Sequence, residues 1–200
     1  MTDWEARYQA GDMPWEKGAA APPLYELLEK TELAMWGSHA VLVPGCGFGH
    51  DARALASQGL EVVGLDISPS ALAHTQQAAP VGAESYQLGD FLDETWQSPA
   101  EISAIWEHTC LCAIDPSQRL AYVAAAARIL PVGGLLAGVF FLNPYDPGEE
   151  RIGPPFGISH EELDQLFTPH FEKIDGWTPH QAYPGREGRE WIGLYRKKRI

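Results

Sequence analysis

The residues with the clearest chemical potential form a glycine-rich segment, PGCGFGHD at 44–51, which follows directly on a short apolar run. Glycine has no Cβ, so Gly45, Gly47 and Gly49 would let the backbone turn sharply and approach a ligand closely. A helix that begins after the loop would add free backbone N–H groups at the same place. A dinucleotide-binding loop has the pattern G-x-G-x-x-G, whereas His50 here stands where its third glycine would be. The segment therefore indicates a nucleotide-like ligand held by a variant of that loop.

Acidic residues end the next two expected strands. Asp66 closes the run EVVGLD, and its carboxylate could accept both ribose hydroxyls of an adenosyl group. The alternative is an acid that only caps a helix before Ser68. Further along, Asp90 could accept from an adenine amino group while Phe91 packs on the ring, unless Asp90 is an ordinary turn acid. This order of elements predicts a nucleoside-type cofactor: a strand, a glycine loop, a helix, a second strand and an acidic residue at its end.

The fourth expected strand ends in WEHT, with Glu107 and His108 at its end. These two side chains should lie where the reactive end of the cofactor meets the substrate. His108 is the best candidate for a general base or an anion-orienting group, because histidine titrates near neutral pH. A purely structural hydrogen-bonding role is the alternative, and Glu107 could instead hold His108 or the cofactor amine. We find no nucleophile–base triad in the sequence.

Substrate walls are expected after the fifth strand and in the loop beyond it. The candidates are Phe141, Tyr145, Pro155 and Phe156, each of which could also be ordinary core packing. Arg186 lies in the glycine turn PGREGRE and could attract an anionic acceptor, although such a turn is more often solvated.

The elements that must position these residues follow from periodicity. Apolar runs predict strands, and amphipathic stretches with caps predict helices. Alternation of the two predicts an α/β fold, a doubly wound seven-stranded mostly parallel sheet with an antiparallel C-terminal edge. In such a sheet, ligands bind at the carboxyl ends of the strands. Strands are expected at 40–44, 61–66, 85–90, 102–107, 134–142, 171–177 and 189–197, and helices at 24–36, 50–59, 68–77, 116–130 and 159–167.

Composition restricts the partners. The chain has 200 residues and a net charge of −13, which suits one domain over 1–200 and opposes binding to nucleic acid or anionic membranes. The cysteines Cys46, Cys110 and Cys112 have neither disulfide-framework nor zinc-site spacing, so we expect free thiols and no metal. No apolar run approaches the roughly 20 residues of a membrane span. The polar N-terminal residues are not typical of a secretory signal. We expect a cytoplasmic protein.

Several motifs occur together in the order of one family. They are the aromatic pattern of Trp4, Tyr8 and Trp15, then VLVPGCGFGHD, VVGLDIS, GDF, WEHTCLCAI and IGPPF. Over nearly the whole chain the sequence resembles the thiopurine S-methyltransferase family, closest to its thiol, thiocyanate and halide methyltransferase branch. His108 departs from the tyrosine of the halide branch and the arginine of the thiopurine branch, and Tyr8 stands where tryptophan is common.

The resemblance implies a Rossmann-like class I methyltransferase that uses S-adenosylmethionine (SAM) and is a monomer. Residues 1–38 would form a helical lid and cofactor clamp, and 39–200 the core. Aromatic faces attract a sulfonium by about 0.5–2 kcal/mol each, and a lid would exclude water from the reaction. The cofactor contacts implied are Trp4, Tyr8, Trp15, Gly45, Gly47, Asp66, Asp90, Phe91 and His108.

The expected activity is methyl transfer to a soft small-molecule nucleophile, such as the sulfur of a thiol, thiocyanate or hydrosulfide. A thiol with a pKa near 8.5 is already partly ionised at neutral pH, so such an acceptor needs little activation. The alternatives are a halide, a metalloid such as tellurite or selenite, or an oxygen or nitrogen acceptor on a metabolite. A non-catalytic SAM-binding module is the remaining alternative.

Overall fold

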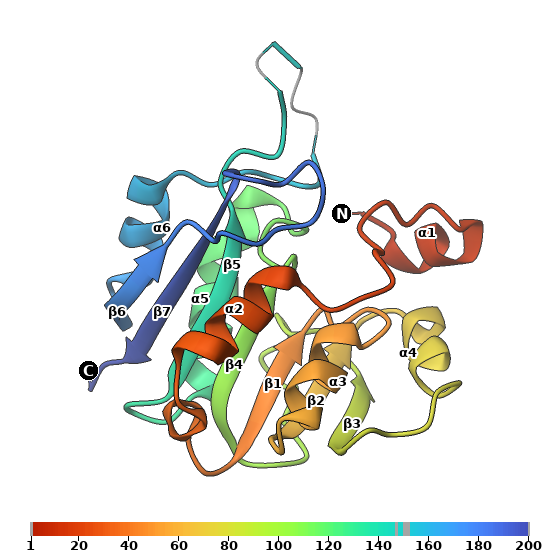
Figure 1. The fold of residues 1–200 in the computed structure, drawn as a ribbon, viewed down its shortest axis with the longest axis horizontal. Helices are drawn as coiled ribbons and strands as arrows, with labels where there is room; N and C mark the ends of the chain where they lie inside the picture. Colours follow the sequence, from red (N-terminus) through yellow and green to blue (C-terminus); the bar gives the residue numbers. More distant parts are fainter. Residues whose placement is uncertain (1, 147, 150–152, 200) are drawn as a thin grey trace.

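A seven-stranded sheet forms the centre of the computed structural model, which describes residues 2–146, 148–149 and 153–199. The strand order is β3-β2-β1-β4-β5-β7-β6. The first five strands pair in parallel, and β7 runs antiparallel between β5 and β6, which confirms the predicted fold class (Figure 1). The strands are β1 (Ala40–Pro44), β2 (Glu61–Asp66), β3 (Ala83–Leu88), β4 (Ile102–His108), β5 (Leu135–Phe141), β6 (Phe171–Trp177) and β7 (Glu190–Lys197).

Helices connect most of the parallel strands, and their caps follow the sequence. Ser68 accepts a hydrogen bond from the Ala71 amide at the start of α4, and Ser159 accepts one from the Glu162 amide at the start of α6. Residues 89–101 join β3 to β4 through turns. The helices are α1 (Trp4–Ala10), α2 (Pro22–Lys30), α3 (His50–Ser57), α4 (Pro69–Thr75), α5 (Arg119–Ile129) and α6 (His160–Phe167), with 3₁₀ turns η1 (Leu33–Trp36) and η2 (Pro116–Gln118).

The continuous helix predicted over 24–36 is wrong, because the chain breaks between α2 and η1. Thr31 is extended, at φ −121° and ψ 149°, and its hydroxyl donates to the Leu27 carbonyl at 2.8 Å. This bond satisfies a carbonyl at the helix end and favours termination there. The chain then turns so that Trp36 packs into the core, 1% exposed.

Apolar side chains cover both faces of the sheet. On one face Tyr122 of α5 and Phe167 of α6 pack with alternate strand residues such as Leu42. On the other face Leu24 of α2 and Leu55 of α3 do the same. The central strands β1, β4 and β5 are covered on both faces, which explains why their sequences are near-continuous apolar runs.

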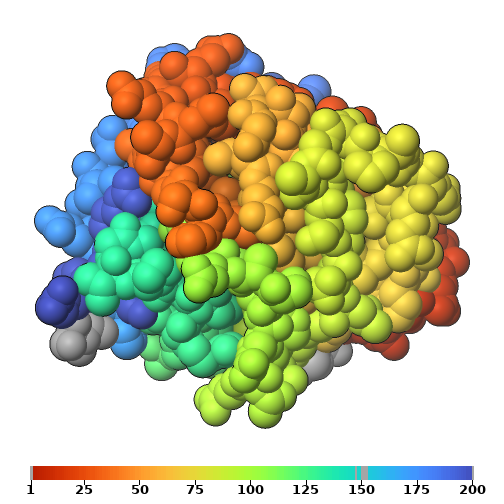
Figure 2. Space-filling view, turned by 90° about the horizontal axis from the view of Figure 1, so that it is seen from below, coloured from red at the N-terminus to blue at the C-terminus, as the bar shows by residue number. Residues whose placement is uncertain are grey.

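The strand order places the chemistry at one edge. Strands β1 to β3 follow one another toward one side of the sheet, and the strands from β4 onward lie on the other side. The strand order therefore reverses between β1 and β4. The carboxyl ends of these strands lie together, where ligands bind in such sheets. Figure 2 views the molecule from below, at the edge of the sheet opposite these carboxyl ends. Segments coloured orange, yellow-green and teal lie against one another there. Within the described ranges, no helix is long and apolar enough to cross a bilayer.

The expected division into a lid at 1–38 and a core at 39–200 stays a prediction. Within the first part, α2 and η1 pack into the core beside the sheet. Only α1 and the chain up to about residue 20 lie beyond the carboxyl edge, with α1 next to α4 (Figure 1).

Candidate active site

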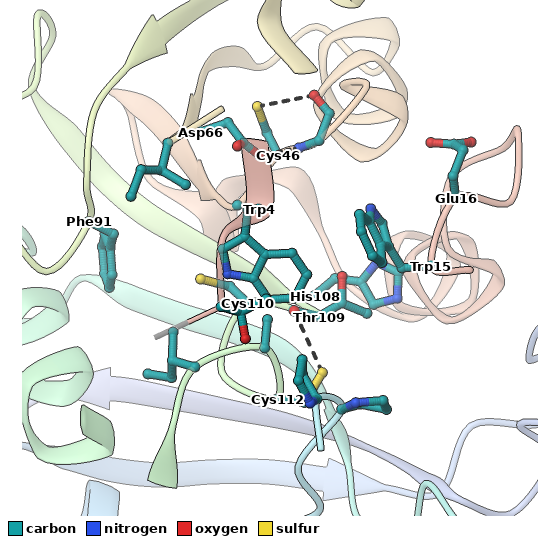
Figure 3. Close-up of a pocket in the computed structure, with 18 of the residues that line it drawn as sticks. Trp4, Trp15, Glu16, Cys46, Asp66, Phe91, His108, Thr109, Cys110 and Cys112 are labelled. Carbon is teal, nitrogen blue, oxygen red and sulfur yellow. Dashed lines mark hydrogen bonds between the residues drawn. The ribbon is translucent and has the colours of Figure 1, made fainter. Parts of the chain in front are cut away.

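A cavity of about 650 Å³ opens at the carboxyl edge, between the sheet and the N-terminal segment. This volume falls in the range of roughly 300–1,000 Å³ that is typical of small-molecule sites. In Figure 3, Asp66 and Phe91 lie on one side of it, and Trp15 and Glu16 on the other, with Trp4 between them. Predicted site residues that line it are Trp4, Tyr8, Trp15, Gly45, Gly47, Asp66, Asp90, Phe91, His108, Phe141, Phe156 and Arg186, together with Pro155.

The glycine loop adopts the backbone that its sequence permits. Gly45, Gly47 and Gly49 have φ values of 61°, 53° and 79°, a region that residues with a Cβ rarely occupy. A Cβ on Gly49 would also lie 2.6 Å from the Tyr86 hydroxyl. The loop therefore needs glycine for its conformation and for close packing.

Asp66 sits beneath this loop at the end of β2. One carboxylate oxygen accepts from the Gly47 amide at 2.8 Å, and the other from the Ser68 amide at 2.9 Å. Burial raises the pKa of Asp66, while the two backbone N–H groups oppose that shift. The residue therefore does cap the turn before α4, and it also faces the cavity, where its oxygens keep free lone pairs for sugar hydroxyls.

The turn after β3 supplies the next part of the wall. Asp90 accepts from the Leu92 amide at 2.8 Å, so it is a turn acid, and its side chain also lines the cavity. Phe91 is 5% exposed and packs on Tyr122, with ring centroids 4.9 Å apart. This side suits the flat face of a purine.

Aromatic side chains of the N-terminal segment cover the cavity. The Trp4 and Trp15 rings meet edge to face at 5.2 Å, and Tyr8 and Trp15 do so at 5.5 Å. The Trp15 indole N–H also donates to the Tyr8 hydroxyl at 3.3 Å. The Arg7 guanidinium lies 4.5 Å from the centre of the Trp15 ring, so this surface already holds a cation. The predicted clamp residues thus form one cluster.

Sequence reasoning missed the residue that docks α1. The Glu5 carboxylate accepts from the Ser68 hydroxyl at 2.5 Å, from the Ser70 hydroxyl at 2.6 Å and from the Ser70 amide at 3.1 Å. These hydrogen bonds lower the pKa of Glu5 to about 2. A glutamate one residue after a predicted clamp tryptophan, and serines at the start of a helix, were the available signals.

His108 projects into the cavity from the end of β4, with its ring stacked on Tyr183 at 6.1 Å between centroids. Its Nδ1 lies 2.8 Å from a carboxylate oxygen of Asp51, in the first turn of α3. The following residue, Thr109, has φ 64°, a strained conformation for a β-branched side chain and one that clusters at functional sites. Asp51 is the last residue of the segment PGCGFGHD and was not identified as a site residue from the sequence.

Glu107 points the other way, as alternation along a strand requires. Its carboxylate accepts from the amides of Cys110 and Leu111, at 3.0 and 2.8 Å, and bonds the Tyr122 hydroxyl. It is 1% exposed and does not line the large cavity. Tyr145 is also outside the lining.

Apolar side chains contribute to the cavity lining near the ends of β4 and β5. Phe141 and Phe156 line the cavity, and the Arg186 guanidinium lies 4.9 Å from the Phe141 ring centre. Arg186 is not a solvated turn residue here, because it pairs with the buried Glu190 at 3.1 Å. The charge of that arginine is therefore already balanced within the protein.

All the cysteines line the same cavity as free thiols. Burial raises the pKa of Cys46 and Cys110 well above the ordinary value, and that of Cys112 to about 12. Buried thiols of this kind stay protonated and are poor nucleophiles. Among the described residues, no cluster of three or more His, Cys, Asp or Glu side chains could hold a metal ion.

Comparison with known proteins agrees with this architecture. The model of the family described as thiopurine S-methyltransferase matches residues 1–187. The chain is 33% identical to probable thiol methyltransferase 2 and 30% identical to thiocyanate methyltransferase 1, both of Arabidopsis thaliana; each match covers 97% of this chain and 84% of the relative.

Solved structures share the fold. A Burkholderia thailandensis 1,6-didemethyltoxoflavin-N1-methyltransferase, crystallised with bound 1,6-didemethyltoxoflavin and S-adenosylhomocysteine, matches with a TM-score of 0.72 at 19% identity, over 98% of this chain and 86% of that one. The family match, the aromatic cluster and the carboxylate beneath the glycine loop together fit SAM as the methyl donor. This chain belongs to the thiopurine S-methyltransferase family and is a SAM-dependent methyltransferase.

Proposed function

We propose that the protein methylates the sulfur of a small thiol, thiocyanate or hydrosulfide. The observation that carries the proposal is the apolar wall formed by Phe141, Pro155 and Phe156 in the cavity lining. Soft, polarisable acceptors suit such a wall, whereas oxygen and nitrogen acceptors need several polar partners. The names of the relatives at 33% and 30% identity support the same substrate class.

SAM supplies a methyl carbon already activated by a sulfonium, so the chain's main task is to hold two reactants in line. Asp66 and the glycine loop would hold the sugar, and Phe91 the adenine. Trp4, Tyr8 and Trp15 would face the sulfonium and exclude water. Glu107, whose hydrogen bonds are with protein groups, takes no part in this scheme.

The test is an acceptor panel with purified protein and SAM, read as release of S-adenosylhomocysteine. We expect thiophenol, hydrosulfide or thiocyanate to react at least about 10-fold faster than iodide and tellurite at equal concentration. The Asp66→Ala variant, in which we expect weaker SAM binding, serves as the control for methylation that depends on the SAM site. Turnover of iodide or tellurite above every sulfur acceptor would overturn the proposal, and so would the absence of sulfur methylation.

We also propose that α1 acts as the lid of this site, held closed by Glu5. In Glu5→Ala the contacts to Ser68 and Ser70 are lost, so the open state gains population and the apparent affinity for SAM falls by about 3–10-fold. Calorimetric titration with SAM measures this effect. Glu29→Ala removes an exposed acid from α2 and is the matched control. Equal affinity in the two variants would contradict the lid assignment.

A further inference from the structure

We propose that Asp51 positions His108 as the base that removes the proton of the acceptor, so that the enzyme is suited to acceptors that arrive protonated. Alkyl thiols and hydrogen sulfide belong to this class, whereas thiocyanate and iodide arrive as anions. The inference rests on the proposed sulfur methylation and narrows its substrate class.

The hydrogen bonds around Asp51 determine which nitrogen of His108 carries a proton. One oxygen of Asp51 accepts from the Ala21 amide at 2.7 Å, and the other from the Trp106 indole N–H at 2.8 Å. A carboxylate held by these donors can only accept, so the bond of 2.8 Å to His108 uses an Nδ1–H donor. Neutral His108 then has its lone pair on Nε2.

The second nitrogen is left for the cavity. Nδ1 is bound to Asp51, and the ring lies against Tyr183 and lines the cavity beside Thr109 (Figure 3). The His108 side chain is 12% exposed, and among the described residues no hydrogen bond occupies Nε2. An acceptor bound against the apolar wall would meet this atom.

Other charged and titratable groups surround the pair. Asp51 faces His108 from α3, Glu107 adjoins it on β4, and Tyr183 stacks on it from the loop before β7. Arg186, near Tyr183, and Glu16 line the same cavity. Burial alone would raise the pKa of Asp51, but His108 and the N–H donors hold it below its ordinary value, so the aspartate stays charged.

Nε2 of His108 takes the S–H proton, and the freed electron pair of sulfur forms the new S–CH₃ bond. The bond from that methyl to the sulfonium breaks, and its pair stays on the sulfur of S-adenosylhomocysteine. Asp51 stabilises the imidazolium, which then releases its proton to water.

The experiment compares acceptors that differ in acidity at pH 7. His108→Gln is expected to reduce kcat/KM by about 100-fold or more for an alkyl thiol, the scale of general base catalysis, and by less than about 10-fold for a nitrothiophenol that is already ionised. Asp51→Asn is expected to reproduce the pattern in weaker form, because a neutral amide stabilises the imidazolium less than the Asp51 carboxylate does. His39→Gln, an exposed histidine at Glu101, is the control.

The pH profile supplies a second reading. Without the base, the His108→Gln variant can methylate only the ionised fraction of the alkyl thiol. Its rate therefore keeps rising with pH up to the thiol pKa, and its rate loss relative to the wild type becomes smaller. The wild-type enzyme can also use the neutral thiol, so its rate rises less steeply with pH over the same range. An equal loss for both thiols at every pH would reduce His108 to a geometric role and overturn the inference.

A readout independent of activity is the histidine tautomer, seen by ¹⁵N NMR. We expect the proton on Nδ1 in the wild type. A wild-type proton on Nε2 overturns the inference, and this measurement stands even if Asp51→Asn does not fold. Failure of the wild type to methylate any sulfur acceptor would instead defeat the proposed function, so the two failures are distinguishable.

Discussion

Replacing Asp66 with alanine is expected to weaken SAM binding about 100-fold. A hydrogen bond to a charged group contributes about 1.5–3 kcal/mol, and the carboxylate is placed to accept from both ribose hydroxyls. The loss also frees the Gly47 amide, which Asp66 holds at 2.8 Å, and so loosens the loop that approaches the ligand. A loss of about 2–4 kcal/mol corresponds to roughly 30- to 1,000-fold in Kd. Calorimetric titration with SAM and with S-adenosylhomocysteine measures it.

Two further variants distinguish the effect of the local Asp66 contacts on SAM affinity from the effect of the protein's overall negative charge. Glu94→Gln removes an exposed acid that does not line the cavity, and we expect its affinity to stay within about twofold of the wild type, because exposed charges are screened. Asp66→Asn keeps the size of the side chain but replaces one acceptor oxygen with a donor, so it should lose nearly as much as alanine. An Asp66→Ala protein that folds and binds SAM within threefold of the wild type would refute the assignment.

Much of this architecture can be predicted from one-dimensional patterns because each pattern has a local cause. Apolar runs of five to seven residues became buried strands, and Ser68 and Ser159 marked helix starts because their hydroxyls accept the first free amides. The cavity residues that end strands were also predictable, since parallel strands bring their carboxyl ends to one edge. The break at Thr31 was missed, because it depends on where Trp36 finds space in the core.

The rest of the site depends on contacts between distant segments. Asp51 and His108 are brought together because β1 and β4 are neighbours, which places the first turn of α3 over the end of β4. Trp106 and His108 share a face of β4, and Asp51 binds both. Glu5 likewise acquires a role only when α1 meets α4. Strand alternation alone could have separated Glu107 from His108, which the sequence interpretation had placed together.

That separation leads to the largest expected effect on stability, in Glu107→Ala. The buried carboxylate binds the Tyr122 hydroxyl and the amides of Cys110 and Leu111, and the Glu107 Cγ lies in the space over Gly138 of β5. Alanine leaves these donors unpaired, at about 1–3 kcal/mol for each buried group, partly offset because a buried acid no longer has to be desolvated. We expect a loss of about 3–5 kcal/mol in the free energy of unfolding, measured by urea denaturation.

Glu107→Gln is the matched variant and adds a pH test. Burial raises the pKa of Glu107, against the hydrogen bonds from Tyr122 and Leu111, so the folded protein holds this proton more tightly than the unfolded chain. The resulting stabilisation is complete below the ordinary pKa of about 4.5 and is lost as pH rises through the folded value. The stability of Glu107→Gln relative to the wild type should therefore increase between pH 5 and pH 8. A difference that is constant or shrinks over this range would mean that Glu107 is not held as a buried acid with a raised pKa, and that its hydrogen bonds instead favour the carboxylate.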